Sequence, residues 1–251
     1  MSAAEDRSVL ERPAPAPDLT VRYGDGPDGV ADVWRGDGRA ASRPLALMVH
    51  GGFWRPEYDR RHTRPLCAAL RAAGWSVAAV EYRRSPGRPD ESVRDVAAAL
   101  ATLPGELAGQ VPFDGSTAVL GHSAGGHLAL WAAAVAPAAR PAGTVALAPV
   151  ADLRLADRLG LDGGAVADFL GGPPQDRADL DPVRLAAPAA PVVLVHGTAD
   201  AIVPPSLTES YAAAHPGARV LAPVGAGHFA PIDPLSTAWP AVLEALASLG
   251  G

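Results

Sequence analysis

The sequence has no lysine: all 21 of its basic residues are arginine, and they form no basic stripe. Together with a formal charge of −6, this argues against nucleic acid as a partner. The single cysteine, Cys67, excludes an intramolecular disulfide. Cys67 lies in an alanine-rich stretch without a basic neighbour, which predicts a place in the core and not a reactive thiol.

Long apolar runs are also missing from the sequence. No run reaches the roughly 18 residues that a membrane-spanning helix needs, so we expect no membrane partner. Residues 1–18 contain charges and prolines but no apolar stretch typical of a signal peptide. We therefore expect a cytoplasmic protein.

The composition is otherwise that of a globular protein, with 251 residues and 48% hydrophobic side chains. A chain of this length can form one α/β domain. The proline-rich residues 1–17 predict a flexible N-terminal arm, and residues 18–251 predict the folded domain. Residues 152–188, which are rich in Asp, Gly and Pro, predict a short insertion with one helical piece at 164–170.

Apolar strands alternate with alanine-rich helices along the domain. Several strands lack polar alternation, which is typical of a parallel sheet covered by helices on both faces. The pattern predicts a doubly wound α/β fold. The candidate strands are 19–23, 30–34, 45–50, 76–81, 117–121, 144–147, 192–196 and 219–222. The candidate helices are 60–73, 91–103, 124–136, 207–215 and 236–249.

A Gly-x-Ser-x-Gly motif, Gly121-His122-Ser123-Ala124-Gly125, lies between a candidate strand and a candidate helix. In this context the motif forms a tight turn that exposes a strained serine at a helix N-terminus, where negative charge is favoured. Glycines at the two outer positions avoid collisions with the neighbouring strand and helix. We therefore predict Ser123 as a catalytic nucleophile.

Another candidate strand ends in His50-Gly51-Gly52-Phe53. Acyl transfer develops negative charge on the carbonyl oxygen, and backbone N–H groups next to glycines can approach that oxygen closely. We assign an oxyanion hole to the N–H group of Ala124 and to one or two of the N–H groups of Gly51, Gly52 and Phe53. We expect His50 to form structural hydrogen bonds and not to act as a base.

Two loops that follow the last strands supply the remaining catalytic candidates. Asp200 follows the strand at 192–196, and His228 lies in a glycine-rich loop after the strand at 219–222. The chain order Ser, Asp, His is that of α/β hydrolases. We predict His228 as the general base and Asp200 as the acid that orients it.

Other residues compete for these roles. His122 is held on the serine turn and cannot fold back onto the neighbouring hydroxyl, whereas His127 lies one helical turn further on and is expected to pack below Ser123. Asp152 is the alternative acid, and its structural interpretation is a cap for the segment that follows. Asp233 lies too close in sequence to His228 to be its natural partner.

Aromatic residues near the expected site are candidates for a substrate pocket. Trp54, Phe169 and Phe229 are assigned to its wall together with Phe53, and the alternative is that they belong to the core. No cysteine and histidine cluster has the spacing of a zinc site, so no metal is expected. The glycines of residues 24–29 are interpreted as a hairpin turn, because neighbouring aspartates would repel a phosphate.

Five segments together resemble the esterase/lipase branch of the α/β-hydrolase superfamily, and most of all its kynurenine-formamidase and feruloyl-esterase-like group. The resemblance covers about residues 44–250 and implies an eight-stranded, mostly parallel sheet and cofactor-free hydrolysis of an ester or activated amide. We expect the insertion at about 152–188 to form a short lid over the carboxyl end of that sheet. The Gly125-Gly126 pair departs from the Gly-Ala pair common in formamidases. The segments are residues 50–54, 121–128, 170–173, 196–204 and 227–228.

We therefore expect a serine hydrolase that cleaves small carboxylic esters through an acyl-enzyme intermediate. An arylformamidase that hydrolyses an aryl amide of the N-formylkynurenine type is the alternative. A non-catalytic binding module is a minor alternative, because Ser123, His228 and Asp200 are all present. A peptidase is the remaining alternative, against which the short insertion and the lack of a propeller-like domain argue.

Overall fold

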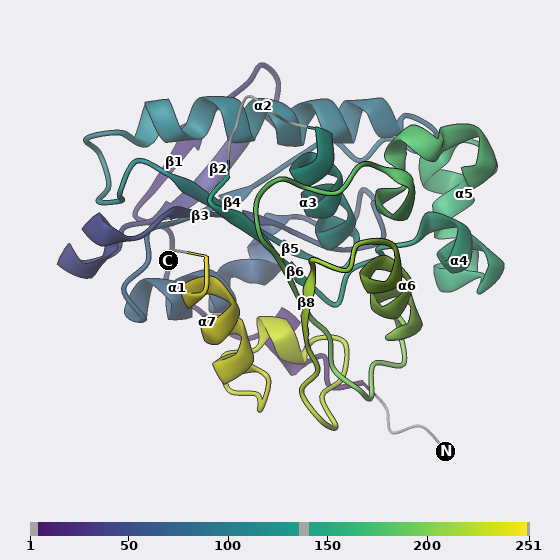
Figure 1. The fold of residues 1–251 in the computed structure, drawn as a ribbon. Helices are drawn as coiled ribbons and strands as arrows, with labels where there is room; N and C mark the ends of the chain where they lie inside the picture. Colours follow the sequence, from purple (N-terminus) through teal and green to yellow (C-terminus); the bar gives the residue numbers. More distant parts are fainter. Residues whose placement is uncertain (1–4, 136–140, 250–251) are drawn as a thin grey trace.

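An eight-stranded sheet forms the centre of the structure (Figure 1). The structure is a computed structural model that describes residues 5–135 and 141–249. The strand order is β1-β2-β4-β3-β5-β6-β7-β8. β2 runs antiparallel to β1 and β4, and all other neighbours are parallel. This confirms the α/β-hydrolase fold with a mostly parallel sheet. The strands are β1 (Leu19–Arg22), β2 (Val30–Trp34), β3 (Leu45–Val49), β4 (Val77–Val80), β5 (Thr117–His122), β6 (Gly143–Leu147), β7 (Val192–Val195) and β8 (Arg219–Leu221).

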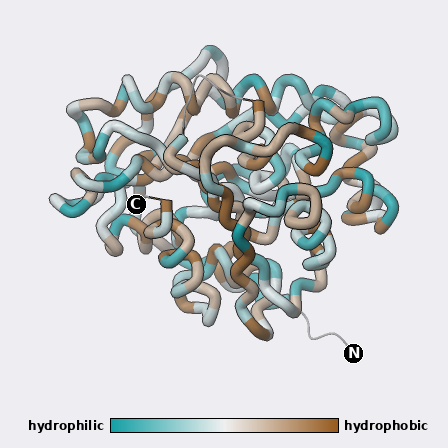
Figure 2. The backbone as a smooth tube through the Cα atoms, in the orientation of Figure 1, coloured by the Kyte–Doolittle hydropathy of each residue, from teal (hydrophilic) through white to brown (hydrophobic). Residues whose placement is uncertain are grey.

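Both faces of the sheet are apolar and covered. In β3, Leu45, Leu47 and Val49 belong to one core cluster, whereas Ala46 and Met48 belong to a second cluster on the opposite face. All five residues are buried, because helices exclude water from both sides of the strand. Figure 2 shows the hydrophobic segments along the central strands. The absence of polar alternation in the sequence therefore reflects a sheet between two helical layers.

The helices lie on both faces of the sheet, as predicted. α2, α3 and α6 contribute side chains to the clusters on one face, and α1 and α7 to the cluster on the other. The first predicted helix begins as a 3₁₀ turn at Arg60–Thr63, and the last residue predicted for the third helix, Ala136, lies outside the described residues. The helices are α1 (Arg64–Ala72), α2 (Pro89–Leu107), α3 (Ala124–Val135), α6 (Ser206–Ala214) and α7 (Trp239–Ala247).

The predicted insertion contains two short helices instead of one. α4 spans Leu153–Arg158 and α5 spans Ala165–Leu170, and 3₁₀ turns connect them to β7. The sequence analysis missed α4, which is only six residues long and begins directly after its capping residue, Asp152. In Figure 1 both helices lie together at one end of the sheet.

The N-terminal segment contacts the domain where the structure describes it. Residues 1–4 of the predicted flexible arm lie outside the described residues, but Ser8–Leu10 form a 3₁₀ turn. Val9 is buried within the cluster that contains α1 and α7. Among the described residues, every helix is too short or too polar to span a membrane.

Candidate active site

Ser123 lies on the sharp turn between β5 and α3. Its φ angle is +55°, an uncommon conformation for a residue with a side chain. The turn requires glycines on both sides: a Cβ at Gly121 would lie 2.2 Å from the carbonyl oxygen of Gly125, and one at Gly125 would lie 2.1 Å from that of Val49. The strained turn places the hydroxyl at the carboxyl edge of the sheet, at the start of α3.

The loop after β3 lies opposite this turn and is strained as well. Gly52, Phe53 and Trp54 all have positive φ angles, of +111°, +48° and +55°. Within the described residues, no group accepts a hydrogen bond from the N–H of Gly52 or Phe53. Ala124 is the first residue of α3, so its N–H has no partner within the helix. These N–H groups are therefore free to bind an oxyanion.

A buried polar network holds the base of this loop. His50 Nε2 lies 2.9 Å from the Glu81 carboxylate, and the Tyr82 hydroxyl donates to the His50 carbonyl oxygen at 2.9 Å. Burial opposes ionisation of Glu81, but its hydrogen bond and charge interaction with His50 and the neighbouring Arg84 hold the pKa of Glu81 well below its usual value. His50 has the structural role expected from the sequence, because its side chain contacts this network.

Asp200 and His228 form a direct hydrogen bond. His228 Nδ1 lies 2.7 Å from Asp200 Oδ2, and both side chains are buried. The backbone N–H groups of Ile202 and Val203 donate to Asp200 Oδ1 at 2.9 and 2.8 Å. Burial opposes ionisation of Asp200, but hydrogen bonds from His196 and His228 outweigh it and lower the pKa of the carboxyl. The ionised acid fixes the His228 proton on Nδ1 and leaves Nε2 free to accept one.

His196 is a second histidine at Asp200 that the sequence analysis did not assign to the site. Its Nε2 faces two acceptors, Asp200 Oδ2 at 3.1 Å and the Val203 carbonyl at 2.8 Å, so Nε2 carries a proton. Its Nδ1 lies 2.7 Å from the Thr208 hydroxyl, which donates to it. His196 therefore orients Asp200. Its position at the end of the strand that precedes Asp200 is the sequence signal for this contact.

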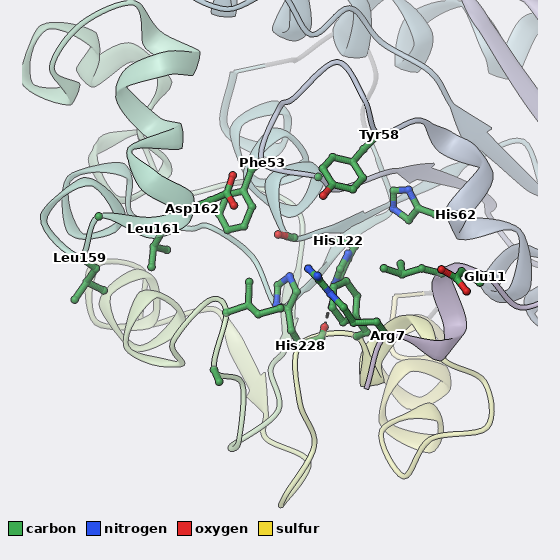
Figure 3. Close-up of a pocket in the computed structure, with 17 residues that line it drawn as sticks. Arg7, Glu11, Phe53, Tyr58, His62, His122, Leu159, Leu161, Asp162 and His228 are labelled. Carbon is green, nitrogen blue, oxygen red and sulfur yellow. Dashed lines mark hydrogen bonds between the residues drawn. The ribbon is translucent and has the colours of Figure 1, made fainter. Parts of the chain in front are cut away.

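A cavity of about 720 Å³ joins these groups (Figure 3). Ser123, His228, Gly52, Phe53 and Phe229, all candidates from the sequence, line it. In Figure 3, His228 lies below the centre of the cavity and Phe53 above it. The structure thus brings the predicted nucleophile, base and loop glycine to one space.

Trp54 and Phe169 do not line this cavity, which corrects their assignment to the pocket wall. Their rings stack at 4.4 Å with 13° between the planes, and both side chains are only 3% exposed. His127 packs edge-on against both rings from α3. The two aromatic residues therefore join the lid helix α5 to the core behind the site.

Several cavity residues come from segments that sequence motifs did not mark. Arg7 and Glu11 enter from the N-terminal segment, Tyr58 and His62 from the loop after β3, and Leu161 from the lid. The lid is joined to the loop after β3 by an ion pair between the Arg55 and Asp162 side chains, at 2.6 Å. No motif connects these segments, since only the tertiary fold brings them together.

The competing candidates have other contacts, although His122 also lines the cavity. Asp152 caps α4 by accepting from the N–H of Leu155 at 2.9 Å, and it also accepts from Ser210. His127 packs in the core behind Ser123, and His122 bonds the His228 carbonyl through Nε2 at 3.1 Å. No group of three potential metal ligands occurs in the part of the chain that the structure describes.

Comparisons with known proteins agree with this fold. A family model described as BD-FAE matches residues 31–151, and one described as prolyl oligopeptidase family matches residues 113–216. Esterase LipC of Mycobacterium tuberculosis is 28% identical over 76% of this chain and 53% of its own length. Esterase LipQ of the same organism is 31% identical over 48% of this chain and 30% of its own length. The chain thus spans about half or less of these relatives.

Solved structures show the same architecture over nearly the whole chain. A thermophilic esterase of Thermogutta terrifontis with bound propionate superposes with a TM-score of 0.71 and 21% identity, covering 92% of this chain and 94% of the other. The fold, the strand order and the matches to family models and relatives together define the class. That class is the α/β-hydrolase fold, and the matched family models and relatives are similar to its esterase/lipase branch.

Proposed function

We propose that this chain is a serine hydrolase that cleaves small carboxylic esters through an acyl-enzyme intermediate. Ser123 is the nucleophile, His228 the general base and Asp200 the residue that orients it. The observation that carries the proposal is the 2.7 Å contact between His228 Nδ1 and Asp200, in a cavity shared with the strained Ser123. A buried acid, an oriented histidine and a serine on a strained turn that lines the cavity together activate a hydroxyl at neutral pH.

In this mechanism Ser123 Oγ attacks the ester carbonyl carbon while its proton passes to His228 Nε2. The oxyanion that forms accepts hydrogen bonds from the N–H groups of Ala124 and of Gly52 or Phe53, with Gly51 shaping the turn. The C–O bond then breaks, and the alcohol leaves with the proton from His228. Water repeats the sequence on the acyl enzyme and releases the acid.

The lining of the cavity favours small acyl groups. Leu159, Leu161 and Ile202 supply some apolar surface, but Trp54 and Phe169 are packed away from the cavity. Each additional methylene contributes about 0.8 kcal/mol only where apolar surface is available to bury it. A related fold is known with propionate bound, which is consistent with a short acyl chain.

Arylformamidase activity is the second candidate, and the aromatic cavity residues favour it. Phe53, Tyr58 and Phe229 line the cavity and offer ring faces to an aryl group. Hydrolysis of an aryl formamide would use the same nucleophile, base and oxyanion donors. Relative rates on aryl esters and on N-formylkynurenine discriminate between the two substrates.

The test combines active-site labelling with a substrate series. A fluorophosphonate probe should label the wild type and the control variant Ser42→Ala, whose hydroxyl is on the exposed surface, but not Ser123→Ala. Ser123→Ala should also lower kcat by about 10⁴-fold or more, because acylation needs the hydroxyl. Labelling or turnover that survives in Ser123→Ala would refute the assignment, and an unlabelled wild type would indicate a binding module.

For the series, kcat/KM on 4-nitrophenyl esters should be highest between acetate and butyrate and lower at octanoate. N-formylkynurenine and an aryl acetate are measured under identical conditions. Best activity on dodecanoate or longer would overturn the small-acyl assignment, and cleavage of a peptide in preference to all esters would indicate a peptidase.

A further inference from the structure

The N-terminal segment, residues 5–12, is anchored along one side of the cavity. The Glu5 carboxylate accepts the backbone N–H of His228 and that of Ala201, each at 2.8 Å. Val9 is 1% exposed, and Arg12 Nη2 donates to Asp233 at 2.9 Å. These contacts at the two ends and the middle hold the segment against the loops that carry Asp200 and His228.

Arg7 lies between these anchors and lines the cavity. Its guanidinium carbon is 5.3 Å from the centre of the Phe229 ring, which directly follows the catalytic histidine in sequence. Figure 3 shows the Arg7 side chain reaching from the N-terminal segment towards the region of His122 and His228. Among the residues that the structure describes, Arg7 forms no ion pair, and it is the only arginine that lines this cavity.

The acidic residues of the cavity leave this cation available. Asp162 is paired with Arg55 at 2.6 Å on the lid side. Glu11 lies at the edge of the cavity in Figure 3, beyond Arg7 as seen from His228. A guanidinium that is held in place without a carboxylate partner can form two parallel hydrogen bonds with a planar anion such as a carboxylate.

The position of Arg7 beside His228 indicates which half of the substrate it meets. His228 must reach the leaving oxygen in order to protonate it, so groups next to His228 face the alcohol portion of an ester. The apolar residues Leu159 and Leu161 come from the lid, on the other side of the cavity in Figure 3. The two sides of the cavity therefore differ in charge as well as in polarity.

We propose that Arg7 is a specificity-determining residue that binds a carboxylate on the alcohol portion of the substrate. The substrate class is then a small acyl ester of a hydroxy acid, aromatic or aliphatic. This inference rests on the proposed esterase function and adds to it the charge of the leaving group. The guanidinium of Arg7 would remain over the Phe229 ring and bind the carboxylate of the substrate. That carboxylate would then lie within reach of the protonated His228 during cleavage.

The experiment compares two acetate esters that differ only in charge, 3-acetoxybenzoate and 3-acetoxybenzamide. Their ratio of kcat/KM values is measured for the wild type, Arg7→Met, Arg7→Lys and Arg35→Met. Arg35 is an exposed arginine outside the cavity, so its variant controls for the loss of one positive charge. Comparing this ratio between the variants cancels any difference in intrinsic reactivity between the two esters.

We expect Arg7→Met to lower the carboxylate-to-amide ratio by about tenfold or more, mainly through KM, because a charge-assisted hydrogen-bond pair is lost. Arg7→Lys should retain part of the preference, and Arg35→Met should match the wild type. Salt should weaken the wild-type preference, since the site is open to solvent.

An unchanged ratio in Arg7→Met, or an equal fall in Arg35→Met, would overturn the assignment of Arg7 while leaving the esterase function intact. Failure of the wild type to hydrolyse the neutral ester in a Ser123-dependent manner would instead overturn the esterase function, and the substrate class with it. Hydrolysis of the neutral ester by the wild type therefore tells a wrong assignment of Arg7 from a wrong esterase function.

Discussion

Acid should destabilise this fold, and His127 allows the effect to be measured at a single residue. Its ring is fully buried behind the active site, with Nε2–H donating to the Leu180 carbonyl at 2.8 Å. Within the described residues its Nδ1 has no hydrogen-bond partner. Burial lowers the pKa of His127 from 6.5 to about 4, although the bond to Leu180 partly opposes the shift.

The direction of the effect follows from proton binding. The unfolded chain takes up a proton near pH 6.5, whereas the folded protein resists it until about pH 4. The free energy of unfolding therefore falls as the pH is lowered through this window, and it changes no further through this group below pH 4. For one histidine with these two pKa values, the loss between pH 7.5 and 5 is about 2 kcal/mol.

The assay is urea unfolding of the wild type and His127→Gln at pH 7.5 and pH 5. Glutamine can still donate to the Leu180 carbonyl but does not titrate, so the variant should lose about 2 kcal/mol less than the wild type over this interval. Near-ultraviolet circular dichroism checks that the variant retains its packing at pH 7.5. An equal loss in both proteins would refute the assignment of a buried neutral His127.

Two further pairs of variants test the site and its support. Asp200→Asn should lower kcat by up to about 10⁴-fold, because the tautomer of His228 is no longer fixed. Asp152→Asn alters a helix cap and should have a far smaller effect on kcat. If the two effects on kcat are reversed, Asp152 and not Asp200 orients the base. Gly126→Ala should lower the free energy of unfolding by about 1–3 kcal/mol in the same urea assay, because its Cβ would lie 2.8 Å from Pro149. A Cβ at Gly105 in α2 would meet no atom within 4 Å, so Gly105→Ala should leave the free energy of unfolding unchanged or raise it.

The fold could be predicted from the sequence because its signals are local. The central strands are short apolar runs, and all eight observed strands begin and end within one residue of the predicted bounds. The serine turn was equally predictable. Gly121 and Gly125 are required because a Cβ at either position would collide with backbone atoms, which are the same whatever side chains the neighbouring residues carry. Asp200 and His228 followed from the rule that parallel strands end at one edge of the sheet.

The walls of the site depended on tertiary packing and could not be predicted in the same way. Trp54 follows the oxyanion loop in sequence, but its positive φ angle turns the ring towards Phe169 and away from the cavity. The prolines of residues 13–17 suggested a loose arm, while the anchoring residues before them carry no pattern. Glu5 is a single carboxylate whose two partners are backbone N–H groups more than 190 residues away.

The contacts of Glu5 connect the loop of His228 with the segment that carries Arg7. A carboxylate that accepts the N–H of His228 restrains the backbone of the loop that carries the proposed base, and the same short segment presents Arg7 to the cavity. The Glu5 contacts therefore restrain both the proposed base, His228, and Arg7, which we propose binds the leaving group. Because both depend on the Glu5 contacts, a substitution of Glu5 should alter leaving-group preference together with turnover, whereas a change in the lid should alter acyl preference alone.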